Sequence, residues 1–99
     1  MSRLACEHAE RVLAQARPAR EWLEARRRGE GDPGKWMGHS IKVQGLHAEL
    51  VHLVDELDEW GYGEIEGRRR LAEARDELRK LSEEIVKQSI DDENRAKSS

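Results

Sequence analysis

Four side chains that can bind metal ions recur along residues 49–59. They are Glu49, His52, Glu56 and Glu59, at successive spacings of three, four and three residues. Because residues three and four apart share one face of an α-helix, these side chains would form a continuous stripe. Carboxylate and imidazole groups are common ligands of divalent metals. The stripe is therefore either a metal site or a solvated helix face, and the sequence leaves both interpretations open.

A second acidic pair gives the metal interpretation a more specific form. Glu56 and Glu59 are followed, after thirteen residues, by Glu73 and Asp76. This pattern resembles the motif of the all-α nucleoside triphosphate pyrophosphatases of the MazG type, in which two acidic pairs on adjacent antiparallel helices hold Mg²⁺ against a triphosphate. The resemblance implies that these four residues bind Mg²⁺, which prefers carboxylate and phosphate oxygens. Mg²⁺ is the cofactor under this hypothesis alone.

The same region also contains the Glu-x-x-His element of carboxylate-bridged di-iron bundles, here Glu49 and His52. Such a site needs a further Glu from another helix, for which Glu21 or Glu24 could serve, and a dimer could supply the second copy. The alternative is that His52 is an exposed or helix-packing residue.

The remaining reactive residues favour simpler interpretations. Cys6 is the only cysteine, which excludes an intrachain disulfide and a cysteine-based zinc module. It lies near His8 without a suitably placed acid, so we expect a buried thiol. Two arginine triplets, residues 26–28 and 68–70, could bind phosphates of a nucleic acid if they lay side by side. They could equally complement a helix C-terminus or pair with nearby acids.

Glycine and proline divide the chain into the elements that must position these residues. Turn chemistry predicts a loop over residues 29–39 and a tight turn over 61–63. We therefore expect one helical domain, 1–89, with a helix over 3–28 that breaks near Pro18, a helix over 40–60 beginning at Ser40, and a helix over 64–89. Residues 90–99 are expected to be a polar, flexible tail.

Apolar periodicity predicts how these helices pack. Two rows alternate spacings of three and four, as the a and d positions of a coiled coil do. They are Val43, Leu46, Leu50, Leu53, Leu57 and Trp60 in the first, and Leu71, Ala74, Leu78, Leu81 and Ile85 in the second. Because the turn between them is short, the two helices should form an antiparallel hairpin. The helix over 3–28 has a weaker, Ala-rich row and should pack across the hairpin, giving an all-α fold.

Several apolar residues lie off these rows. They are Trp22, Ile41, Val51, Val54 and Val86. Two interpretations are open: a two-fold dimer that completes a helical bundle, or a monomer in which the first helix covers them.

Composition limits the function classes. Basic and acidic residues, 18 and 21, nearly cancel to a net charge of −3, and no apolar run is long enough to span a membrane. We expect a soluble, cytoplasmic protein that contacts no membrane. The leading hypothesis is a small non-catalytic protein that acts by protein–protein association and self-association, as an adaptor, assembly or inhibitor-like factor. Bulky side chains near the predicted breaks are the candidate partner contacts: Trp36, Met37, Trp60 and Tyr62. The alternatives are the pyrophosphatase and a nucleic-acid-binding accessory protein.

Overall fold

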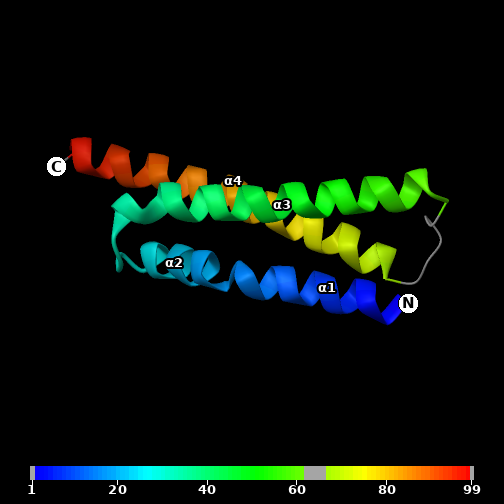
Figure 1. The fold of residues 1–99 in the computed structure, drawn as a ribbon. Coiled ribbons are helices and arrows are strands. Elements are labelled where there is room, and N and C mark those ends of the chain that lie inside the picture. The colour runs from blue at the N-terminus through cyan, green and yellow to red at the C-terminus, as the bar shows by residue number, and fades with distance from the viewer. Residues whose placement is uncertain (1, 62–66, 99) are drawn as a thin grey trace.

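Four α-helices make up most of the computed structural model, which describes residues 2–61 and 67–98. They are α1 (Ser2–Gln15), α2 (Arg17–Arg27), α3 (Trp36–Glu59) and α4 (Arg68–Ser98), with one 3₁₀ turn, η1 (Pro33–Lys35), before α3. No strand occurs in these ranges. The long helices α3 and α4 pack as an antiparallel pair, and α1 and α2 follow one another alongside it (Figure 1). The all-α class and the antiparallel pair are confirmed.

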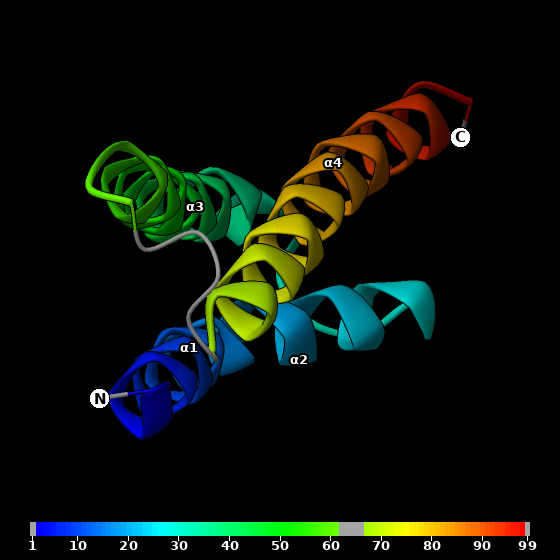
Figure 2. The ribbon, with the colours of Figure 1, turned by 90° about the vertical axis from the view of Figure 1, so that its right-hand side faces the viewer.

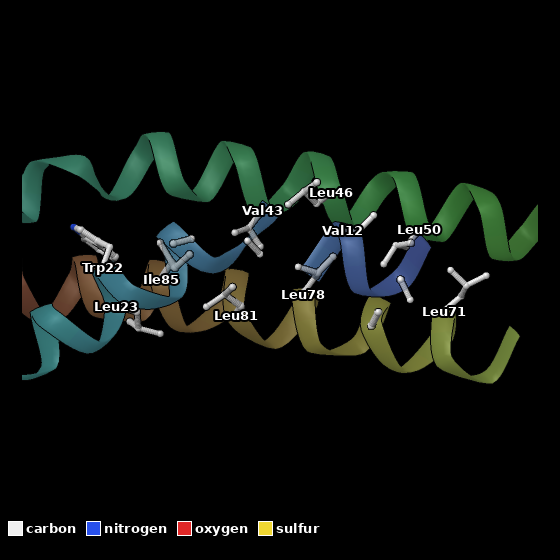
Figure 3. Packing of buried hydrophobic residues seen from close by; sticks show 14 of the residues in the cluster. Val12, Trp22, Leu23, Val43, Leu46, Leu50, Leu71, Leu78, Leu81 and Ile85 are labelled. Carbon is white, nitrogen blue, oxygen red and sulfur yellow. The ribbon is translucent and has the colours of Figure 1, made fainter. Parts of the chain in front are cut away.

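The buried row of α4 is the predicted one: its five residues from Leu71 to Ile85 are all buried (Figure 3). On α3 the row matches only in its first half. Val43, Leu46 and Leu50 are buried, but Leu53 and Leu57 are only half-buried, and Trp60 is 67% exposed. A straight helix has 3.6 residues per turn, so a strict seven-residue repeat drifts around it by about 20° per heptad. This drift carries Trp60 away from the core and brings Val54 into it.

The helices α1 and α2 complete the core from one side of the α3–α4 pair (Figure 2). Their buried positions keep heptad spacing across the break at Ala16; they are Ala9, Val12, Ala16, Ala19 and Leu23. Trp22 is also buried against this core. For Trp22 and Val54, the interpretation in which the single chain covers them holds, because both belong to the core that α1 and α2 complete with the α3–α4 pair.

The connection between α2 and α3 is built around Asp32. Its side chain accepts a hydrogen bond from the backbone N–H of Gly34 at 2.8 Å, and Pro33 opens η1. The indole Nε1 of Trp22 donates to the carbonyl oxygen of Asp32, also at 2.8 Å. Because the capped turn leads straight into α3, this helix begins at Trp36 rather than at the expected Ser40. Ser40 instead lies buried inside the helix.

The C-terminal part of α4 is anchored to α2. Arg26 donates from Nε and Nη2 to the two carboxylate oxygens of Asp92, at 3.0 and 2.8 Å. The side chains of this pair are only 12% and 7% exposed, and Gln88 also donates to Asp92. The helix α4 continues beyond this contact to Ser98. The described residues 90–98 are thus helical, contrary to the expected flexible tail.

The helix α3 ends at Glu59, and Gly61 follows it with a φ of +84°, in the left-handed region that glycine favours. The predicted turn beyond Gly61, the predicted start of the next helix at residue 64, and Tyr62 lie outside the described residues.

Candidate interaction surface

The acidic stripe of α3 is divided between separate ion pairs. Glu49 Oε1 lies 3.3 Å from Nε2 of His8 on α1, whereas Glu56 Oε1 lies 2.9 Å from Nε2 of His52 on its own helix. Glu59 is exposed at the end of α3. Within residues 2–61 and 67–98, no three His, Cys, Asp or Glu side chains are placed to hold one metal ion.

The second acidic pair also contacts cations. Glu73 lies 3.5 Å from Nε of Arg69 and 3.7 Å from Nη1 of Arg70, and Asp76 lies 3.5 Å from Nε of Arg75. The four-carboxylate arrangement that the pyrophosphatase resemblance implies is therefore not assembled in the described part of the chain. Glu21 and Glu24, the further ligands of the di-iron hypothesis, are exposed on α2.

The two arginine triplets lie far apart. Arg26 binds Asp92, whereas Arg70 donates from Nε to Glu10 at 2.6 Å and from Nη1 to Glu77 at 3.3 Å. On α4, Arg70 and the Asp92 that binds Arg26 are 22 residues apart, about 33 Å of helix. Arg68 is paired with Asp58 at 2.6 Å. The triplets consequently do not form one phosphate-binding surface. The nucleic-acid hypothesis requires them to lie side by side, and they do not.

The candidate partner contacts have different surroundings. Trp36 is half-buried and packs against the core. Met37 and Trp60 are 55% and 67% exposed, but they lie at opposite ends of α3. Cys6, expected to be a buried thiol, is half-buried and free, beside a His8 that is paired with Glu49.

Met37 belongs to a group of exposed apolar residues that we call the α3–α4 face. Its members are Met37 and Ile41 on α3, and Val86 and Ile90 on α4, with 36–64% of each residue exposed. The two residues of each pair are four apart and so share a helix face. Because the helices are antiparallel, the start of α3 and the end of α4 lie at the same end of the molecule (Figure 1). The described chain thus carries an apolar surface that its own packing leaves open.

Part of this surface is predictable from the sequence. Met37 is one of the candidate partner contacts, and Ile41 and Val86 lie off the a/d rows, but Ile90 falls in the segment expected to be a flexible tail. The i, i+4 spacing of Val86 and Ile90, continuous with the α4 row, was the signal that could have found it.

Comparison with known proteins gives no family assignment: no protein-family model, curated protein or solved structure matches this chain. In the parts of the chain that the structure describes, no helix has the length and apolar character needed to cross a membrane.

Proposed function

We propose that this protein acts by association with protein partners, without catalytic chemistry of its own, as a small adaptor, assembly or inhibitor-like factor. The observation that supports the proposal is the exposed α3–α4 face, on a chain whose other large apolar residues are mostly in the core. Apolar residues gathered on a surface mark interaction sites, and methionine is enriched in the cores of interfaces. Self-association and binding of a different protein both use such a face.

Site-specific photo-cross-linking in the expressing cell tests this proposal. A photoreactive amino acid at Ile41 should yield one discrete cross-linked species, whose mass identifies the partner. Excess wild-type chain should compete for this species, and the Ile41→Glu variant should not.

The matched control places the same photoreactive amino acid at Ala14, an exposed residue on α1. Equal cross-linking from Ala14 and Ile41, or none from Ile41, would contradict association through the α3–α4 face.

A further inference from the structure

The helices α1 and α2 lie on one side of the α3–α4 pair and do not cover its opposite side (Figure 2). One flank of α3 faces α2, where His39 packs on Trp22 with ring centroids 5.5 Å apart. One flank of α4 carries ion pairs to α2, from Glu77 to Arg20 and from Glu84 to Arg27. At about 100° per residue, Ile41 and Val86 fall on the opposite flanks of their helices.

Both outward flanks continue as rows along the whole pair. The row on α3 is Met37, Ile41, Ala48, Asp55 and Glu59, with spacings of four, seven, seven and four. The row on α4 is Arg68, Arg75, Arg79, Val86 and Ile90, with spacings of seven, four, seven and four. Each row is apolar at one end and charged at the other, acidic on α3 and mainly basic on α4, where the exposed Glu83 lies between Arg79 and Val86.

The antiparallel packing sets the two rows at matching levels. The apolar start of the α3 row lies at the level of the apolar end of the α4 row. The acids of α3 lie nearest the level of Arg68, and Arg75 and Arg79 follow further along, toward the level of Ala48. Arg68 and Asp58 show this level directly, because they pair across the two helices at 2.6 Å. A partner could place an α4 row on this α3 row and an α3 row on this α4 row. Apolar residues would then lie against apolar residues, and acidic residues against basic ones.

Resting on the proposed function, we infer that the partner is a second copy of this chain. The two copies dock about a two-fold axis parallel to the helices, so that α3 of each lies over α4 of the other. This rotation preserves the level of every residue and makes each crossing pair antiparallel, as in an up-and-down four-helix bundle. A two-fold axis perpendicular to the helices would instead place α3 on the antiparallel α3 of the other copy. The apolar end of each row would then lie against the charged end of the same row in the other copy.

Light scattering on the purified full chain across a concentration series tests the partner. We expect the mass to rise to that of a dimer, and Ile41→Glu to raise the dissociation constant at least about 30-fold, as for an interface hot spot. Because Ile41 is 64% exposed in the single chain, the variant should keep its helical circular dichroism. The control Ala14→Glu should dimerise as the wild type does.

Cross-linking tests the arrangement. In a Cys6→Ala background, Ile41→Cys and Val86→Cys chains are mixed and treated with a short bis-maleimide. We expect mixed dimers in excess over either homodimer.

An excess of Ile41–Ile41 homodimers would overturn the parallel axis. A monomeric mass at every concentration, or an equal response of Ile41→Glu and Ala14→Glu, would overturn the second copy as partner. If a monomeric chain still cross-links from Ile41 to a different protein in the cell, this inference fails while the proposed function stands.

Discussion

The pair of Arg26 and Asp92 is the least exposed of the ion pairs described above, and it joins the C-terminal part of α4 to α2. The hydrogen bond from Arg26 holds the pKa of the Asp92 carboxyl below its ordinary value. A carboxyl with a depressed pKa in the folded state contributes stability at pH values above its unfolded pKa, near 3.8, and this contribution is lost as the pH falls through the lower, folded value. The pair should therefore stabilise the fold fully at neutral pH.

We predict that Asp92→Asn lowers the free energy of unfolding by about 1–3 kcal/mol at pH 7, the contribution of hydrogen bonds to charged groups. Urea denaturation measures this change, and amide exchange of residues 93–98 should become faster. Asp91→Asn, a substitution at the exposed neighbour, is the control. Equal losses in the two variants would show that the contact with Arg26 does not anchor α4.

His39 should make stability depend on pH in a higher range. Burial, and secondly the charge of Lys35, lower the pKa of His39 from its ordinary value of 6.5. The unfolded chain then takes up a proton before the folded chain does, so stability should fall as the pH drops through about 6.5.

We expect the thermal midpoint of the wild type to decrease more between pH 8 and pH 5.5 than that of His39→Gln. The control is His52→Gln, a substitution at an exposed histidine that contacts Glu56. The decrease of its thermal midpoint between the two pH values should equal that of the wild type. Parallel profiles for the wild type and His39→Gln would contradict the effect of burial on His39.

Three of the four acids of the pyrophosphatase resemblance each contact other side chains rather than one another, which makes a clear prediction for Mg²⁺. Glu56 contacts His52, Glu73 contacts two arginines, and Asp76 contacts Arg75. Because an assembled carboxylate site would be stabilised by its metal, millimolar Mg²⁺ should leave the thermal midpoint unchanged. Pyrophosphate release from nucleoside triphosphates should not be detected. A Mg²⁺-dependent rise that disappears in Glu56→Gln would favour the enzyme.

At the scale of elements, the buried row of α4 was predictable from the sequence, and that of α3 only in part. The α4 row continues in register from Leu71 to Ile85, whereas on α3 the predicted row drifts away from the core after Leu50. Heptad spacing alone does not show where a helix stops following its partner, because this depends on how α1 and α2 fill the other side.

Two adjacent leucines of the predicted row should respond differently. Leu50 is fully buried, so Leu50→Ala should cost about 2–5 kcal/mol. Leu53 is half-buried, and Leu53→Ala should cost clearly less. Chemical denaturation of both variants measures the difference. A loss at Leu53 as large as that at Leu50 would restore the strict a/d row, and a loss at Leu50 of only about half a kilocalorie, typical of a surface site, would contradict its burial.

The ends of the elements were the least predictable. Asp32 and Pro33 form the N-terminal signal of the α3 region, but the glycines around them suggested a longer loop and Ser40 a later cap. The helical residues 90–98 depend on Arg26, which is 66 residues away from Asp92 in the sequence. Local composition cannot report such a contact. Because residues 90–98 were expected to be a flexible tail, Ile90 was not expected on the α3–α4 face. Ile90 is one of the two residues that α4 contributes to this face.

At the scale of the whole molecule, the chain is an elongated bundle of 55 × 20 × 16 Å. Its core contains many alanines, and one long side remains uncovered by α1 and α2. The single chain thus buries Trp22 and Val54, two of the residues that lie off the a/d rows, but leaves Met37, Ile41, Val86 and Ile90 exposed. A second copy on this side would cover them with the same helices that form the pair.

The thermal midpoint as a function of protein concentration tests most directly whether the α3–α4 face is an interface between two copies. Because subunit binding stabilises only the folded state, the midpoint of the wild type should rise over a hundredfold increase in concentration. The midpoint of Ile41→Glu should stay constant over the same range, and that of Ala14→Glu should rise as for the wild type. A wild-type midpoint that is flat across this range would contradict the account.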